Sequence, residues 1–229
     1  MRPFEVRLRN ARGREWRTFR EPLAVVHAIR PDEVAQCLAE ADRAVRSDGC
    51  YAAGFVGYEA AAAFGLPTHA PRPDGLPLVC LGLFHPDKVT SERALPAGGA
   101  YRAGEWRPSI DPAAYAAAID RIKSHIESGD TYQINFSFRL TASFAGDPIA
   151  LLRDLDFAQD GPWGAYVDDG RFAICSASPE LFFRIDGDRI ECRPMKGTAP
   201  RGLWAAADRQ QAERLVTSEK QQAENVMVV

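Results

Sequence analysis

Short runs in which apolar and polar residues alternate recur along the chain and predict β-strands. The clearest run lies at 132–140, where Tyr, Ile, Phe, Phe and Leu alternate with polar side chains, as in a strand with one face on a core. Residues 4–9 and 15–19 predict an opening hairpin around residues 11–13. Further strands are predicted at 51–59, 78–84, 163–167 and 171–175.

Apolar residues at helical spacing predict α-helices between these runs. Residues 32–47 carry such a pattern, with Pro31 at the start and Gly49 just beyond the end, as is typical of helix termini. Asp-Pro pairs at 111–112 and 147–148 combine an N-capping side chain with proline at the first helical position, so each predicts a helix start. Helices that link hairpins predict an α+β fold with largely antiparallel sheets.

Composition and charge narrow the class of protein. The chain has 229 residues, of which 46% are hydrophobic and 26% charged, as in a globular domain. A net charge of −3 gives no electrostatic reason to expect nucleic acid or an anionic membrane as a partner. The sequence has neither a membrane-spanning apolar run nor the apolar core of a signal peptide, so we expect a cytoplasmic protein. Five irregularly spaced cysteines predict small buried residues rather than disulfides or structural zinc.

The segment SPELFFRIDGDRIECRPMKGTAPRG, at 178–202, carries the most chemistry. Its β-prone runs at 181–185 and 189–192 flank an Asp-Gly-Asp turn, and this order predicts a hairpin because glycine accepts a positive φ. A hairpin folds its ends together, so Glu180 and Lys196 would lie on one side of one sheet. A carboxylate that can protonate a leaving group and an amine that can attack form an acid and nucleophile pair.

Both residues also have a structural interpretation. A lysine in a Gly-Thr turn is most often a solvated surface charge, and a glutamate at the start of a strand is common on surfaces. For Lys196 the neighbouring Arg193 and Arg201 favour chemistry, since nearby positive charge disfavours the ammonium form and leaves more free amine to attack.

Three blocks of sequence together carry a resemblance to a known family. They are GDTYQINFSFRL at 129–140, SPELFF with RPMKGTAPRG, and SEKQQAENVMVV at 218–229. These blocks resemble the chorismate-utilising enzymes, and among them component I of aminodeoxychorismate synthase, an enzyme of 4-aminobenzoate and folate biosynthesis. The resemblance implies stacked antiparallel sheets flanked by helices, with 1–110 as the N-terminal part and 111–229 as the first part of the catalytic region. It also implies a C-terminal portion beyond this chain, so we expect the 229-residue piece alone to be inactive.

The resemblance also implies roles for individual residues. Glu180 of the SPE motif corresponds to the general acid or base, and Lys196 to the lysine that adds to chorismate. Anthranilate synthases usually have alanine there, so Lys196 favours aminodeoxychorismate. Gly197 and Thr198 would offer backbone and hydroxyl donors to a substrate carboxylate.

The third block predicts a helix with a metal ligand. Ser218 followed by Gln221 matches a capping box. The resemblance implies that Glu224 gives a carboxylate to Mg²⁺, a hard cation that prefers oxygen ligands. The structural alternative is that Lys220 and Glu224 form an exposed i,i+4 pair.

The resemblance also covers a tryptophan pocket. The stretch GPWGAYV aligns with one wall of the pocket that binds tryptophan in some relatives, and so places Pro162, Trp163 and Gly164 there. The helix at 32–47 does not match the opposite wall. We therefore favour the structural interpretation, a turn that enters a strand with Trp163 in the core.

Two further partners follow from the implied reaction. Ammonia would come from a separate glutamine amidotransferase subunit, because the chain has no recognisable cysteine nucleophile motif and its histidines are scattered. An aminodeoxychorismate lyase, fused or separate, would act next. The alternatives are an anthranilate or isochorismate synthase, or a non-catalytic module that docks an amidotransferase or holds tryptophan.

Overall fold

The protein is described by a computed structural model that covers residues 2–10, 15–70 and 75–227. Its residues form two compact units, the first made of Met1–Pro96 with Leu151–Val229 and the second of Ala97–Ala150. These units group residues by contact, whereas the predicted division at residue 110 separates regions by function, so that division stays a prediction.

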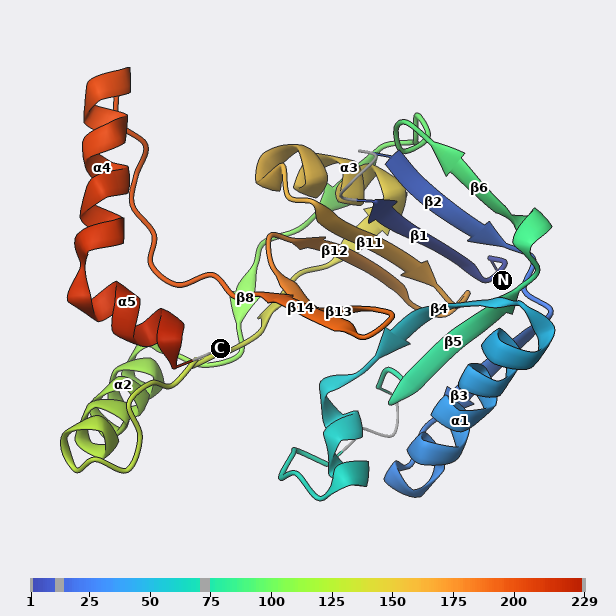
Figure 1. Cartoon of the computed structure of the whole chain (residues 1–229), viewed down its shortest axis with the longest axis horizontal. Coiled ribbons are helices and arrows are strands. Elements are labelled where there is room, and N and C mark those ends of the chain that lie inside the picture. The colour runs from blue at the N-terminus through green and yellow to red at the C-terminus, as the bar shows by residue number, and fades with distance from the viewer. Residues whose placement is uncertain (1, 11–14, 71–74, 228–229) are drawn as a thin grey trace. The chain divides into compact units, whose positions relative to one another are not determined.

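The first unit contains a five-stranded antiparallel sheet, in which strands from residues 5–20 lie beside strands from residues 163–178 (Figure 1). Its central strand, residues 5–10, pairs on one side with residues 15–20 and on the other with residues 165–168. Val6 lies opposite both Phe19 and Val167. The predicted hairpins at 4–19 and 163–175 are confirmed, although residues 11–13 lie outside the described part. In spatial order the strands are β12 (Ala173–Ser178), β11 (Trp163–Asp168), β1 (Glu5–Asn10), β2 (Glu15–Arg20) and β6 (Val89–Glu92).

A second antiparallel sheet has β5 (Val79–Phe84) between β3 (Ala24–Ala28) and β4 (Tyr51–Val56). Helix α1 (Pro31–Asp48) covers this sheet and buries a face that includes valine, cysteine and alanine. Gly49 ends the helix in the left-handed conformation, with φ of 65°, which glycine adopts without steric cost. Two 3₁₀ helices complete this region. They are η1 (Tyr58–Phe64), which follows β4, and η2 (Pro86–Lys88), which follows β5.

The two sheets share a core of apolar side chains. Val6, Phe19 and Val167 come from the five-stranded sheet, and Ala53 and Phe84 from the three-stranded sheet. The rings of Phe19 and Phe84 lie 5.5 Å apart between centroids. Antiparallel sheets stacked over an apolar core and flanked by helices confirm the predicted α+β fold.

The second unit contains one helix and two short antiparallel pairs. Helix α2 begins where the Asp-Pro pair predicts, because Asp111 Oδ1 accepts a hydrogen bond from the backbone N–H of Ala114 at 2.7 Å. Its helix and strands are β7 (Tyr101–Ala103), β8 (Arg107–Pro108), α2 (Pro112–Glu127), β9 (Leu140–Thr141) and β10 (Phe144–Gly146).

The strand predicted at 132–140 was wrong for most of its length. Only Leu140–Thr141 pairs, with β8, and residues 133–139 have no assigned strand. The apolar side chains of this stretch, including Phe136 and Phe138, are exposed, and these two rings contact Tyr115 of α2. A strand needs a ladder of hydrogen bonds to a neighbour, and here the bonding lies at the end of the stretch, where the backbone N–H of Ser109 donates to the backbone oxygen of Arg139 at 2.8 Å.

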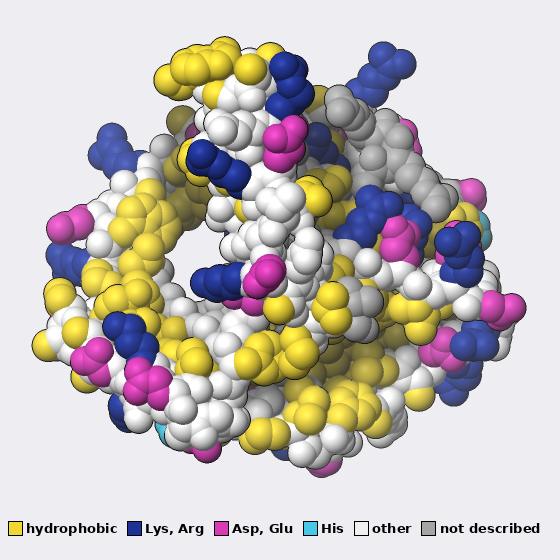
Figure 2. Space-filling view, turned by 60° about the vertical axis from the view of Figure 1, so that its left-hand side comes forward, with side chains coloured by type: hydrophobic (Ala, Val, Ile, Leu, Met, Phe, Trp, Pro, Cys, Tyr) yellow, Lys and Arg dark blue, Asp and Glu magenta, His cyan; other side chains and the backbone are white. Residues whose placement is uncertain are grey.

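The remaining elements of the first unit lead to the candidate site. Hydrophobic side chains are exposed on several of them, and Figure 2 shows such side chains on one face of the protein. Phe182, Val216 and Val226 are examples, and an exposed apolar surface of this kind is typical of a contact surface. These elements are α3 (Pro148–Gln159), β13 (Leu181–Asp186), β14 (Arg189–Arg193), α4 (Ala205–Thr217) and α5 (Glu219–Val226).

The cysteines differ in their surroundings. Cys37, Cys50 and Cys80 are buried as predicted, whereas Cys175 is half-buried and Cys192 is exposed, so the prediction of burial was wrong for Cys192. Burial raises the pKa of the Cys80 thiol to about 11. Among the helices in the described part of the chain, none is both long and apolar enough to cross a membrane.

Gly54 of β4 offers a test of the sheet packing. A Cβ atom at this position would lie 2.0 Å from the backbone oxygen of Cys80 in β5. We expect Gly54→Ala to lower the free energy of unfolding by about 1–3 kcal/mol, because a paired backbone cannot yield as a side chain can. At Gly57 a Cβ atom would meet nothing closer than 3.5 Å. Gly57→Ala is therefore the control, and equal urea midpoints for the two variants would contradict the packing.

Candidate active site

The hairpin predicted at 181–192 forms, and its turn has the predicted chemistry. Strands β13 and β14 are antiparallel, with Leu181 opposite Arg193 at the open end and Asp186 opposite Arg189 beside the turn. Gly187 has φ of 59°, a conformation that favours glycine. The residues before β13 and after β14 are therefore held at the same end of the hairpin.

A hydrogen bond holds the Glu180 side chain against the turn that carries Lys196. Its Oε1 accepts a hydrogen bond from the backbone N–H of Met195 at 3.0 Å. Ser178 fixes the approach of this glutamate, because its hydroxyl donates to the backbone oxygen of Glu180 at 3.0 Å and accepts from the backbone N–H at 3.3 Å. Glu180 is exposed and Lys196 is half-buried. The hydrogen bond to Met195 therefore holds an exposed carboxylate beside the residue that directly precedes Lys196.

Helix α5 adds a third element to this cluster. Gly197 has φ of 75°, and a Cβ atom there would lie 2.3 Å from Oε1 of Gln221, so this side chain lies directly against the turn. Gln221 and Glu224 are both half-buried and, at spacing i,i+3, share one face of the helix. The structure thus places Glu224, the predicted metal ligand, on the same face of α5 as the side chain that contacts the turn of Lys196. Thr198, the next residue, is exposed.

The two arginines that flank Lys196 in the sequence each form an ion pair with a carboxylate. Nε of Arg193 is hydrogen-bonded to Glu191 at 2.5 Å. Arg201 forms a bidentate pair with Asp208, with both N–O distances 2.6 Å. The hydrogen bond from Arg201 lowers the pKa of Asp208, which also accepts from a backbone N–H. Each guanidinium is thus paired with a carboxylate of this chain, and the activation of Lys196 by these two arginines stays a prediction.

Glu224 does not make a magnesium site with the other described residues. Its carboxylate faces Lys220 at 3.9 Å, as in the structural alternative for this pair. No group of three or more His, Cys, Asp or Glu side chains in the described part of the chain is arranged to hold a metal ion. A carboxylate is a suitable ligand for Mg²⁺, but a single one rarely holds the ion. Mg²⁺ sites in proteins usually combine it with a second carboxylate or with substrate oxygens.

The stretch predicted to line a tryptophan pocket enters β11. Trp163 is half-buried opposite Ser178, and Gly164 is buried. A Cβ atom at Gly164 would lie 2.5 Å from the ring of Trp16, so the indole of this chain's own Trp16 fills the space beside Gly164. Tryptophan binding there stays a prediction.

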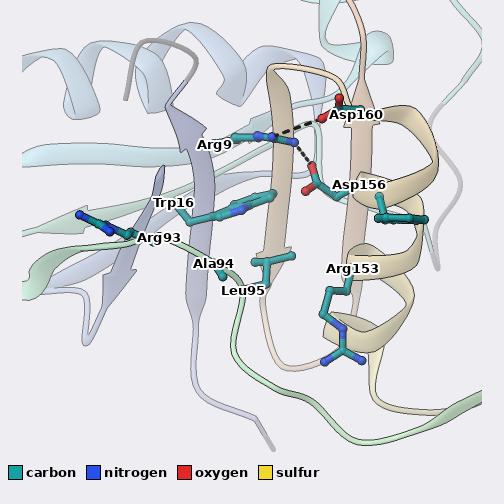
Figure 3. Close-up of a pocket in the computed structure, with 9 residues that line it drawn as sticks. Arg9, Trp16, Arg93, Ala94, Leu95, Arg153, Asp156 and Asp160 are labelled. Atoms are coloured by element: carbon teal, nitrogen blue, oxygen red, sulfur yellow. Dashed lines mark hydrogen bonds and ion pairs between the residues drawn. The ribbon is translucent and has the colours of Figure 1, made fainter. Parts of the chain in front are cut away.

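A cavity of about 460 Å³ borders Trp16, between β1, β2 and α3 (Figure 3). Arg9 reaches across it to Asp156 at 2.6 Å and to Asp160 at 3.8 Å. None of the residues predicted to be catalytic lines this cavity.

The match to known proteins agrees with this arrangement. A family model described as chorismate binding enzyme matches residues 5–229. The chain belongs to the chorismate binding enzyme family. This membership covers both units, so the hairpin, the Lys196 turn and α5 all lie within the matched region.

Two curated relatives and one solved structure show the extent of the likeness. Aminodeoxychorismate synthase component 1 of Salmonella typhimurium is 34% identical over 203 residues, 78% of this chain and 44% of that protein. Anthranilate synthase component 1 of Thermus thermophilus is 38% identical over 141 residues, 62% of this chain and 29% of that protein. The isochorismate synthase DhbC of Bacillus anthracis has a TM-score of 0.67 over 99% of this chain and 58% of that chain, at 19% identity, and shares the fold. The chain thus spans less than half the length of these curated relatives.

Two contacts in the cluster were missed by sequence reasoning. Asp208 binds Arg201 and also accepts from the backbone N–H of Gly202 at 3.0 Å, which fixes the chain after the Lys196 turn. Gln221 was interpreted only as a helix cap. The pair between Arg201 and Asp208 had a clue in the sequence, because an acidic residue follows the arginine by seven positions. The contact of Gln221 with the turn depends on how α5 packs, so the sequence held no local signal for it.

Proposed function

We propose that the protein containing this chain is component I of an aminodeoxychorismate synthase, a cytoplasmic enzyme that converts chorismate and ammonia to 4-amino-4-deoxychorismate. The observation that supports this most is Lys196 in a turn fastened to Glu180. The 34% identity to the Salmonella typhimurium component 1 protein supports the same choice. A glutamine amidotransferase would supply the ammonia, and a lyase, fused or separate, would convert the product to 4-aminobenzoate.

The proposed reaction removes the C4 hydroxyl of chorismate and places an amino group there. Hydroxide is a poor leaving group unless it is protonated. Glu180 gives it a proton and it departs as water, while the free amine of Lys196 forms a bond to C2 and both ring double bonds shift. Ammonia then forms a bond to C4, both double bonds shift back, and the C2–N bond breaks so that Lys196 leaves as a free amine.

The other residues of the turn would hold the substrate. Gly197 offers a backbone N–H and Thr198 a hydroxyl to a substrate carboxylate, and the exposed position of Thr198 leaves its hydroxyl open to a ligand. Mg²⁺, when bound through Glu224 and substrate oxygens, would neutralise the negative charge of chorismate. The described residues alone do not complete that site, so ligands from outside this chain are part of the proposal.

The alternatives differ in the nucleophile and in the role of the chain. An anthranilate synthase is disfavoured by Lys196, and an isochorismate synthase would add water instead of ammonia. A module that only docks an amidotransferase would make no product at all. Product analysis of the full-length protein with chorismate, Mg²⁺ and ammonium separates these possibilities.

The nucleophile role of Lys196 predicts a large effect of its removal. In the full-length protein we expect Lys196→Ala to lower aminodeoxychorismate formation from chorismate and ammonium at least about 100-fold, because covalent addition is lost. Mass spectrometry of the wild-type protein with chorismate should detect an adduct on Lys196. Lys123→Ala, which removes an exposed lysine on α2, is the control. Undiminished turnover by the Lys196 variant would exclude the role.

The acid role of Glu180 predicts a selective loss. Glu180→Gln keeps the shape of the side chain and an oxygen that can accept from Met195, but it cannot give a proton to the leaving hydroxyl. We expect kcat to fall about 100-fold or more with KM for chorismate nearly unchanged, because proton transfer matters in the transition state. Steady-state kinetics measure both quantities. A rise in KM alone would instead indicate a binding role.

The metal proposal predicts a difference between the piece and the full-length protein. Because the described residues offer Glu224 without a second suitable ligand, we expect the 229-residue chain to bind Mg²⁺ no better than millimolar and to turn over no chorismate. In the full-length protein, chorismate should tighten Mg²⁺ binding. Calorimetric titration of both proteins measures this. Micromolar binding of Mg²⁺ by the 229-residue chain with chorismate would show that it carries its own second ligand.

A further inference from the structure

A serine hydroxyl holds the bend between β12 and β13. β12 ends at Ser178, β13 begins at Leu181, and the chain bends at Glu180 between them. The Ser178 hydroxyl bonds to both backbone groups of Glu180, since it donates to the oxygen at 3.0 Å and accepts from the N–H at 3.3 Å. Pro179, the residue between them, has a φ that its ring fixes. The backbone that carries the Glu180 side chain therefore has little freedom to move.

The same bend packs closely against Gly161, which is buried. A Cβ atom at Gly161 would lie 2.9 Å from the backbone oxygen of Ser178 and 3.4 Å from Cα of Pro179. Closely packed backbone atoms cannot yield as the end of a flexible side chain can. Residues 178–180, here called the SPE corner, are thus fixed both by a hydrogen-bonded hydroxyl and by close packing.

The two carboxylate oxygens of Glu180 differ in their surroundings. Oε1 accepts from the backbone N–H of Met195 at 3.0 Å, and the carboxylate makes no other hydrogen bond or ion pair with the described residues. Oε2 is therefore the oxygen that is left for a ligand. Glu180 is exposed, so its carboxylate is open to a substrate.

The N–H of Met195 suits an acid that must give up its proton. As the proton leaves, negative charge develops on the carboxylate, and a hydrogen bond to a charged acceptor is stronger than one to a neutral acceptor. A backbone N–H that is already aimed at Oε1 stabilises this charge without reorganisation. The bond therefore contributes more in the transition state than in the complex with bound substrate.

We propose that Oε2 of Glu180 delivers the proton to the departing C4 hydroxyl of chorismate, with Oε1 held by the Met195 N–H and with Ser178 as a positioning residue. The inference rests on the proposed function. The proton passes to the hydroxyl oxygen, the electrons of the C4–O bond leave with the water, and Lys196 bonds to C2. Glu180 is left as a carboxylate and regains a proton that ammonia loses after it has bonded to C4.

The positioning role is tested in the full-length protein by two substitutions at Ser178. We expect Ser178→Ala to lower kcat for chorismate consumption about tenfold, because the SPE corner loses its hydroxyl and the proton donor is misplaced. KM for chorismate should stay within about twofold of wild type. Ser178→Thr keeps a hydroxyl and should restore most of the rate. Ser176→Ala removes another half-buried serine of β12, and as the control it should leave kcat unchanged.

The bond from Met195 is tested by a spectroscopic signal that needs no turnover. In full-length protein with isotope-labelled methionine, the amide signal of Met195 is identified by its absence in Met195→Leu. This signal should move as the solution is acidified and Glu180 takes up a proton, and it should not respond in Glu180→Gln. In Ser178→Ala the response should shrink. Replacement of the Met195 N–H by an ester oxygen should lower kcat about tenfold, the effect of one lost hydrogen bond to a charged group.

The outcomes separate the inference from the proposed function. Wild-type protein that consumes chorismate without forming aminodeoxychorismate would refute the proposed function, while kcat for chorismate consumption would still decide the role of Ser178. In protein without turnover, the Met195 signal decides the positioning. Unchanged kcat in Ser178→Ala, or a Met195 signal that ignores the protonation of Glu180, would overturn the inference. Equal losses in the two Ser178 variants, with a lowered melting temperature, would also overturn it, because they would indicate packing alone.

Discussion

The pairing of β1 with β11 is the constraint on which the first unit depends. It joins residues near the start of the chain to residues about Val167, and β1 at the same time pairs with β2. Loop closure over such a separation costs entropy, which the ladder and the buried contacts of Val6 and Val167 offset. Because β12 follows β11 directly and leads into Ser178, this pairing also determines where the candidate active site begins.

The candidate site depends on backbone contacts more than on pairs of side chains. The bond from the Met195 N–H to Glu180 connects the two ends of the hairpin, and the contact between Gly197 and Gln221 brings α5 to the same turn. Both contacts fix the backbone on either side of Lys196. Such positioning is what an amine nucleophile requires, since misplacement by about 1 Å costs orders of magnitude in rate.

Charge in this region is largely neutralised within the chain. Arg193 and Arg201, the nearest basic residues in sequence to Lys196, pair with Glu191 and Asp208. The pair between Arg201 and Asp208 ties the segment after the turn to α4.

Local sequence alone determined the elements whose signals lie within a few residues. The Asp-Gly-Asp turn between β13 and β14, the Asp-Pro start of α2 and the Gly49 end of α1 all formed as predicted, because steric and capping preferences act over short distances. Helix α4 was not predicted, since among residues 205–217 the only large apolar side chains are Leu215 and Val216.

Tertiary structure decided the features that depend on a distant partner. The alternating pattern at 132–140 predicted a strand, but a strand also needs a neighbour to accept its hydrogen bonds, and the pattern cannot say whether one is present. The partners of Arg193 and Arg201 and the direction of the Gln221 side chain likewise follow from packing. The sequence therefore determined which chemical groups this chain carries and where its turns fall, whereas only the folded structure decided which of those groups meet, because contacts between distant residues are set by the packing of whole elements.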